Sequence, residues 1–396
     1  MPLVSRPRTA ATVLGLSVVT AVALTGCATG AASSGAPDVD CLHGGSLALV
    51  VPVHAGAQAP GVPPEWDCAL DAAIRRSAPI SVVTVEGNPQ VVVSGFRADV
   101  NTSNELVAAD DVTAAKNVVV GAVSGATATS DGVDLLAALA LAADLAPGGQ
   151  VMSLDNGATD SGVVRTVEDG MTTVVDPADV ATLVVDSSSC PSVEGARVEL
   201  YGLGYQVAPA EPLSPRQHDR LEQVWRATLE ACGAEVAVVA LPRTGDGPTT
   251  ARTARAVTPE EDPAMPTPAA GAAACEAVLP DAVVGFVADE ATFLDPARSI
   301  EVIADAADRV AACPGTIEVV GTTSSAGTPD GRERLSTQRA EAVRAILADR
   351  LGVPESDVVA RGLGFDRDEC VEDRPDGVLD PVLAAQNRKV VIRVGA

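Results

Sequence analysis

Lysine and the aromatic residues are scarce in this chain of 396 residues. Phe, Trp and Tyr make up only 2% of the sequence, so its hydrophobic cores must be built mainly from Val, Ala and Leu. Lys116 and Lys389 are the only lysines, and arginine therefore carries nearly all of the positive charge. The formal net charge of −26 at pH 7 argues against nucleic acid, or an anionic membrane surface, as an electrostatic partner.

The sequence also lacks the motifs of common catalytic and cofactor sites. It contains no G-x-S-x-G, no phosphate-binding P-loop, and no G-x-G-x-x-G between a strand and a helix. No two of the histidines His43, His54 and His218 have ligand spacing on a helix or hairpin, and no cysteines have zinc spacing. We therefore expect no enzyme activity, no cofactor and no metal ion.

The N-terminal segment has the features of an export signal. Arg6 and Arg8 precede a short apolar run, Ala10 to Leu24, which is too short for a membrane span and ends in small residues. The ending Leu24-Thr25-Gly26-Cys27 resembles the lipobox of bacterial lipoproteins, which implies cleavage before Cys27 and lipid attachment to it. The alternative is a plain signal peptide with an incidental cysteine. We expect an exported protein anchored to the outer face of a membrane, with a signal peptide at residues 1–26 and a tether at residues 27–40.

The other cysteines fit an exported protein, because disulfides form in oxidising compartments. Proximity in the sequence suggests three pairs: Cys41–Cys68, Cys190–Cys232 and Cys275–Cys313. Cys370 is then left without a partner. The sequence alone does not determine the connectivity.

Composition divides the rest of the chain into two blocks. Residues 244–274 are rich in Pro, Thr, Ala and Gly and have no apolar period, which predicts an extended linker. The larger block, residues 41–243, alternates strand-like and helix-like patterns, with a hairpin at 80–96, helices at 131–145 and 214–232, and strands at 47–53, 151–154, 198–203 and 236–241. This alternation predicts an α/β fold with a mainly parallel sheet that helices cover on both faces.

The order of elements and the stretch DLLAALALAADLAPGGQVMSLDNGATDSG, residues 134–162, resemble a von Willebrand factor A domain. That family binds a metal ion through Asp-x-Ser-x-Ser after its first strand. The corresponding residues of this chain are Val53-His54-Ala55-Gly56-Ala57, which have neither a carboxylate nor a hydroxyl. Thr127 and Asp155 could lie near the remaining ligand positions, but two oxygens do not make a site. The resemblance therefore implies the fold without the metal, and Asp155 is interpreted as a turn residue in Asp-Asn-Gly.

The smaller block, residues 275–396, has the pattern β-α-β-α-β-β, which predicts a two-layer α/β sandwich with helices on one face. The expected strands are 283–287, 316–320, 358–363 and 390–394, and the expected helices are 296–312 and 335–351. Five stretches of the block, GFVADEATFLDP, IEVVGTTSSAG, LSTQRAEAVRAIL, RGLGFD and NRKVVIRV, resemble the OmpA-like peptidoglycan-associating domain.

The resemblance implies a site for the diaminopimelate residue of the peptidoglycan stem peptide, held by an aspartate and an arginine. Arg339 matches the arginine, but the aspartate position, fifteen residues earlier, is Ser324 in Thr323-Ser324. Arg332 stands where the family's loop usually has asparagine, and Asp330 could reach in as a substitute acid. Asn387 and Arg388 match the family's closing pair, which implies a role in shaping the site.

We expect this helix to begin at Ser336, because serine is a good N-cap. An inward-facing Arg339 near that end would form a carboxylate trap, because free amides and a guanidinium both donate hydrogen bonds to an anion. The alternative is that Arg339 pairs with a nearby Glu. Arg332 and Arg334 are interpreted as solvated charges at the rim.

Two functions remain open at this point. In the first, a lipid-anchored envelope protein contacts peptidoglycan non-covalently through residues 275–396, with weakened or altered preference because Ser324 replaces the aspartate. The block at 41–243 then binds an unknown protein or ligand, or acts as a spacer. In the second, an exported adhesion or interaction lipoprotein acts through that block, and the OmpA-like domain is a retained fold that does not bind.

Overall fold

The computed structural model describes residues 41–100, 102–242, 245–266 and 275–395. All of the described residues belong to one compact unit. The predicted signal peptide, the tether and Cys27 lie outside the described residues. None of the described helices is both long enough and apolar enough to cross a membrane.

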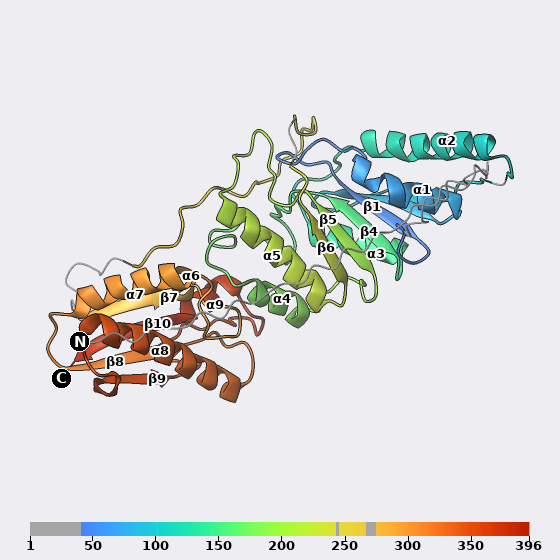
Figure 1. Ribbon diagram of the computed structural model, residues 1–396. Coiled ribbons are helices and arrows are strands. Elements are labelled where there is room, and N and C mark those ends of the chain that lie inside the picture. Colours follow the sequence, from blue (N-terminus) through green and yellow to red (C-terminus); the bar gives the residue numbers. More distant parts are fainter. Residues whose placement is uncertain (1–40, 101, 243–244, 267–274, 396) are drawn as a thin grey trace, which may run out of the picture. The chain divides into compact units, whose positions relative to one another are not determined.

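The larger block is built on a six-stranded sheet with the strand order β3-β2-β1-β4-β5-β6 (Figure 1). The only antiparallel pair within this sheet is β2 with β3, so the prediction of a mainly parallel sheet is confirmed. The strands are β1 (Leu47–Pro52), β2 (Ile80–Val85), β3 (Val91–Phe96), β4 (Gln150–Leu154), β5 (Arg197–Tyr201) and β6 (Glu235–Val239). Continuous apolar runs such as LALVVP form the central strands because both faces are covered.

Helices cover both faces of this sheet, as predicted. On one face lie α1 (Asp67–Arg75), which follows the short 3-10 turn η1 (Pro64–Trp66), and α2 (Glu105–Ser124). On the other lie α3 (Leu135–Leu145), α4 (Pro177–Asp186) and α5 (Pro215–Ala231). Each face has an apolar cluster made mostly of Val, Ala and Leu around one fully buried tryptophan, Trp66 or Trp225. The sequence reading missed α1, α2 and α4 and began α3 too early, because the side chain of Asp134 caps that helix.

The smaller block has a four-stranded sheet in the order β7-β10-β8-β9, in which only β8 and β9 run parallel. Helices α7 and α8 share a single apolar cluster with this sheet, so the predicted two-layer sandwich is confirmed. Its strands are β7 (Glu276–Pro280), β8 (Thr316–Thr322), β9 (Val358–Gly362) and β10 (Lys389–Gly395). Its helical elements are α6 (Asp281–Val284), α7 (Pro296–Val310), α8 (Pro329–Leu351), η2 (Glu355–Asp357) and α9 (Pro381–Asn387).

Two predicted elements of this block are wrong. The strand expected at 283–287 is replaced by β7 just before it and by the turn of helix α6, which ends at Gly285 in a left-handed conformation. Helix α8 begins two turns before Ser336, because the side chain of Thr328 caps it and Pro329 fits its first position. Ser336 is buried in mid-helix, where its hydroxyl accepts a hydrogen bond from the N–H of Gly364.

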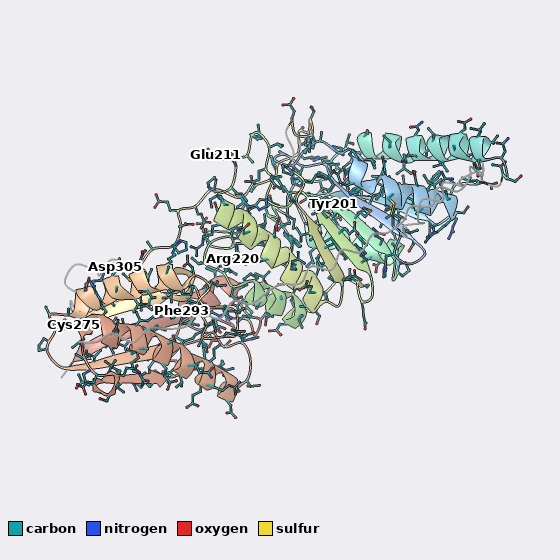
Figure 2. All side chains as sticks on the ribbon, in the orientation of Figure 1. Tyr201, Glu211, Arg220, Cys275, Phe293 and Asp305 are labelled. Atoms are coloured by element: carbon teal, nitrogen blue, oxygen red, sulfur yellow. A yellow bond between two sulfur atoms is a disulfide. The ribbon has the colours of Figure 1, made fainter. Side chains whose placement is uncertain are left out.

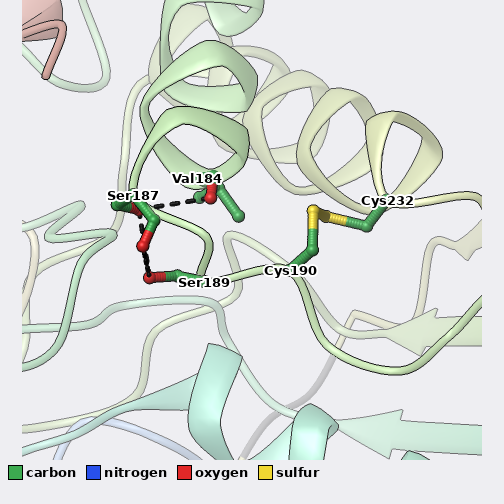
Figure 3. The surroundings of a disulfide bond; sticks show 5 residues. All are labelled: Val184, Ser187, Ser189, Cys190 and Cys232. Carbon is green, nitrogen blue, oxygen red and sulfur yellow. Dashed lines mark hydrogen bonds between the residues drawn. A yellow bond between two sulfur atoms is a disulfide. The ribbon is translucent and has the colours of Figure 1, made fainter.

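Three disulfides are present: Cys41–Cys68, Cys190–Cys232 and Cys275–Cys313. Cys190–Cys232 ties the loop after α4 to the C-cap of α5, next to a turn in which the Ser187 hydroxyl bonds to Ser189 (Figure 3). Cys275–Cys313 joins the residue before β7 to the segment after α7. Cys370 is a free, half-buried thiol, and burial raises its pKa.

Part of the predicted linker is held against the first block. The side chain of Val257 is buried in a small cluster with Ala158 and Val167. The Glu260 carboxylate accepts hydrogen bonds from the N–H of Gly170 and the hydroxyl of Thr173. We call residues 245–262 the strap, since hydrogen bonds and the buried Val257 hold them on the first block and they are not a free spacer. The domain boundaries themselves stay predictions.

Candidate ligand-binding site

A cavity of about 350 Å³ opens where β8 ends and α8 begins. The smaller block contributes Thr323, Ser324, Arg332, Arg339 and Arg388 to its lining, and α4 contributes Asp176 and Asp179. The structure therefore brings together most of the site residues expected from the sequence. It adds two acidic residues from the other block that the sequence reading did not select.

Two glycines let α8 approach the sheet closely and so set the position of the cavity. A side chain at Gly321 would meet the carbonyl oxygen of Ser336 at 2.2 Å, and one at Gly362 would meet the Thr337 nitrogen at the same distance. Only glycine allows the helix backbone to lie against β8 and β9 at this point. Arg339 follows one turn later on the same helix and so reaches the cavity at the ends of these strands.

The loop after β8 presents Thr323 and Ser324, which are both buried. It is fixed by backbone bonds, from the Thr323 N–H to the Gly364 carbonyl at 2.9 Å and from the Ser325 N–H to the Asp373 carboxylate at 2.8 Å. The Thr323 hydroxyl has no hydrogen-bond partner among the described residues, although the residue is only 4% exposed. A buried hydroxyl without a partner is costly, so a ligand group here would gain from bonding to it.

Arg339 is 4% exposed and points its guanidinium toward the loop at 286–290. Its Nε donates to the Glu290 carbonyl at 3.0 Å, its Nη1 lies 3.6 Å from the Asp281 carboxylate, and its Cζ lies 4.9 Å from the centre of the Phe286 ring. Phe286 stacks in turn on Phe293, which Figure 2 labels. Burial raises the pKa of Asp281 while the charge of Arg339 opposes that shift. The alternative partner for Arg339, a Glu side chain, is thus replaced by the Asp281 carboxylate and the backbone carbonyls of Glu290 and Val287.

The carboxylate trap at a helix N-terminus is not what the structure shows. Arg339 lies well inside α8, because that helix begins at Pro329, and the free amides of its first turn are far along the chain from Arg339. Any anion held by Arg339 would therefore be held by the guanidinium and by cavity groups, without the amides of this helix.

The three other charged residues expected around the loop take different positions. Arg332 is not a solvated rim charge, because its Nη1 donates to the carbonyls of Ser325 and Gly327 and braces the loop. Arg334 is exposed at the cavity edge, as a rim charge would be. Asp330 is exposed in the first turn of α8 and does not line the cavity. Its expected role as the acid that replaces the family's aspartate therefore does not match the structure.

Asn387 and Arg388 have distinct roles in the geometry. The buried Asn387 amide bonds to both backbone groups of Val371 and to the Asp373 carboxylate, and Asp373 in turn holds the Ser325 N–H. Asn387 therefore stabilises the loop that carries Ser324. Arg388 lines the cavity and forms an ion pair with Asp179 of α4. Its Nη2 donates to Asp179 Oδ1 at 2.6 Å, and its Nη1 contacts Oδ2.

Helix α4 supplies a second acidic residue beside Arg388. Asp176 is the N-cap of α4, and one carboxylate oxygen accepts from the Ala178 N–H. Its other oxygen lies 3.8 Å from Nε of Arg388. Burial lowers the pKa of Arg388, and the charge of Asp176 opposes this shift. The pair Asp176-Pro177 is a helix-start signal that could have revealed α4 from the sequence.

The place where the first block would carry a metal holds a buried pair. His54 Nε2 lies 2.8 Å from the carboxylate of Asp155, at the ends of the neighbouring strands β1 and β4. Asp155 also accepts from the N–H of Gly157, as its assignment to a turn implies, while Thr127 is exposed after α2. Among the described residues no group of three or more His, Cys, Asp and Glu side chains could hold a metal ion.

Residues 286–376 match the OmpA family. The C-terminal domain is OmpA-like. The match spans the cavity loop and the whole of α8, which carries Arg339. It does not reach Asn387 and Arg388. No curated protein matches the chain.

Solved structures with similarity to the chain include three bacterial proteins. The OmpA-like domain of FopA1 from Francisella tularensis is 20% identical, over 30% of this chain and 70% of that one, with a TM-score of 0.23. The cell wall anchor of the T6SS from Pseudomonas aeruginosa is 20% identical over 31% and 80%, with a TM-score of 0.26. The peptidoglycan-associated lipoprotein from Burkholderia pseudomallei is 25% identical over 30% and 89%, with a TM-score of 0.23.

Proposed function

We propose that the chain is a lipid-anchored protein of the cell envelope whose OmpA-like domain binds peptidoglycan non-covalently. Cys27 would carry the lipid, and the cavity at the end of β8 would take the end of a stem peptide. The larger block would be a von Willebrand A-like domain that binds no metal and acts as a spacer or binds an unknown partner. Neither block is proposed to catalyse a reaction.

The observation that carries this proposal is the cavity, most of whose lining residues belong to the stretch that matches the OmpA family. Arg339 and Thr323 line it with a guanidinium and an unpartnered hydroxyl. These groups suit the carboxylate of a stem peptide, since arginine binds carboxylates with charge-assisted hydrogen bonds. Ser324 also lines the cavity and carries no negative charge, which supports an altered preference for the ligand ammonium.

Co-sedimentation of the purified chain with peptidoglycan sacculi tests the proposal. We expect the wild-type chain to pellet with sacculi that contain diaminopimelate. Arg339→Ala should reduce binding by about tenfold to a hundredfold, the loss expected for a charge-assisted bond to a carboxylate. Binding that is unchanged in this variant would contradict the role of Arg339.

Two further variants separate the loss of this contact from other effects of the exchange. Arg350→Ala makes the same change on the same helix, but at an exposed residue paired with Asp308, and should leave binding unchanged. Arg339→Lys keeps the buried charge and loses the planar fork, which covers the case in which Arg339→Ala does not fold. Circular dichroism of each variant separates a lost contact from a lost fold.

A second candidate function is an interaction role for the larger block. Helix α2 leaves Leu106, Val107 and Val118 exposed, with Leu106 at 79%. Apolar side chains in this number on one helix suit contact with another macromolecule. This function becomes the better account if the wild-type chain stays in the supernatant with every type of sacculus.

A further inference from the structure

The OmpA-like domain taken by itself makes a strongly positive cavity. Arg332, Arg334, Arg339 and Arg388 all line it, whereas Asp289 is the one carboxylate that this domain contributes to the lining residues. Asp289 is exposed, so water and salt screen its charge. Such a cavity suits a carboxylate but repels the ammonium group of a diamino acid.

Helix α4 changes this balance from across the cavity. Asp176 and Asp179 add two carboxylates, and their side chains are only 17% and 1% exposed. Charges in such surroundings are screened far less than exposed ones. Both carboxylate oxygens of Asp179 contact the Arg388 guanidinium. Asp176 Oδ2 lies farther away, 3.8 Å from Arg388 Nε. Asp176 is therefore the acid that remains available to a ligand.

The helix lines the cavity without filling it. About 350 Å³ of space remains between α4 and the loop at Thr323, within the range of small-ligand pockets. The buried Thr323 hydroxyl on the opposite wall still lacks a partner among the described residues. Space together with an unpartnered buried group indicates a site for a polar ligand and argues against a plug.

We propose that α4 completes the peptidoglycan site, and that Asp176 supplies the negative charge for the ligand ammonium that Ser324 lacks. Asp179 holds Arg388 and with it the position of α4. The ligand class is a diamino acid side chain that carries an ammonium and a carboxylate, as at the end of a diaminopimelate-containing stem peptide. This inference rests on the proposed function and makes the site a joint product of both domains.

Asp176→Asn tests the inference cleanly, because asparagine is as good an N-cap as aspartate and only the charge is lost. The probes are meso-diaminopimelate and pimelate, which has the carboxylates but no ammonium, measured by calorimetry on the whole purified chain. The wild type should prefer diaminopimelate, and Asp176→Asn should bind it about tenfold more weakly, with pimelate binding unchanged or tighter.

Two matched variants locate the effect. Asp186→Asn removes a charge from the same helix at its contact with Arg374, away from the cavity, and should leave the preference unchanged. If Asp289→Asn, and not Asp176→Asn, abolishes the preference, the acid comes from the OmpA-like domain and the inference is wrong. If Asp176→Asn instead binds diaminopimelate more tightly, α4 occludes the site, and the inference is again wrong.

Failure of the inference is separable from failure of the proposed function. A wild-type chain that binds sacculi through Arg339, with no change in Asp176→Asn, overturns only the role of α4. A wild-type chain that binds neither sacculi nor diaminopimelate overturns both.

Discussion

His54 shows how a single residue can decide what a fold is able to do. Its imidazole lies between β1 and β4, where the von Willebrand A resemblance would place metal ligands, and bonds to Asp155 at 2.8 Å. Burial opposes the charged imidazole, but the nearby Asp155 carboxylate and its hydrogen bond hold the pKa of His54 above its ordinary value.

This pair predicts a pH dependence of stability with a definite sign. Because the pKa of His54 is higher in the folded state, its stabilising effect is complete below the unfolded value of about 6.5 and is lost as pH rises through the folded pKa. Within that window the free energy of unfolding should fall by up to about 1.4 kcal/mol per pH unit relative to His54→Asn. Urea unfolding followed by tryptophan fluorescence measures it, since both tryptophans lie in the first block.

If wild type and His54→Asn lose stability in parallel between pH 6 and pH 9, His54 does not carry a raised pKa.

Ser324 offers a second prediction for a single residue. Ser324→Asp places a carboxylate in the cavity beside Thr323. Because Asp176 already supplies a negative charge for the ligand ammonium, we expect this exchange to change the binding of diaminopimelate little in the wild type, and to strengthen it by about tenfold in the Asp176→Asn chain. Asp330→Asn serves as the comparison, because Asp330 is exposed outside the cavity and its loss should change nothing. A tenfold gain in the wild-type background would show that Asp176 does not satisfy the ammonium. No gain in either background would show that the site takes no ammonium.

At the scale of elements, the sequence was most informative where apolar patterns were long and continuous. The hairpin β2–β3 was predicted with the bounds that the structure has, and β1 and β4 within a residue. Helix α8 was misjudged because Ser336 looks like a cap, while the position of the real cap, Thr328, depends on how the loop folds back. Likewise, the sequence pattern predicts a solvated Arg332, because the backbone carbonyls that it binds come together only when the loop has folded.

The strap gives a prediction for one element. Val257→Asp puts a charge into the small apolar cluster at Ala158 and Val167, and should release residues 245–262 from the first block. Trypsin should then cut faster after Arg252 and Arg255, which both lie in the held segment, with Arg255 paired to Glu168. Val359→Asp, the same exchange at an exposed strand position, should leave the cleavage rate unchanged. Equal rates in both variants would mean that the strap is not held in solution.

On the scale of the whole molecule, the contact between α4 and Arg388 could not have been predicted from sequence patterns. Asp179 and Arg388 are separated by 209 residues, and nothing local in either segment points to the other. The positions of Arg339, Thr323 and Ser324 in one site followed from the family resemblance, but the acids opposite them did not. A site assembled from two domains becomes visible only when both are folded.

The central claim, that the OmpA-like domain holds peptidoglycan, is tested most directly by the affinity of the whole chain for sacculi. The measurement is a co-sedimentation isotherm of wild type and Arg339→Ala on walls with and without diaminopimelate. We expect saturable binding by the wild type to the diaminopimelate wall, and weaker binding by the variant and to the other wall. Absence of wild-type binding to every wall would contradict the account and move the search for function to residues 41–243.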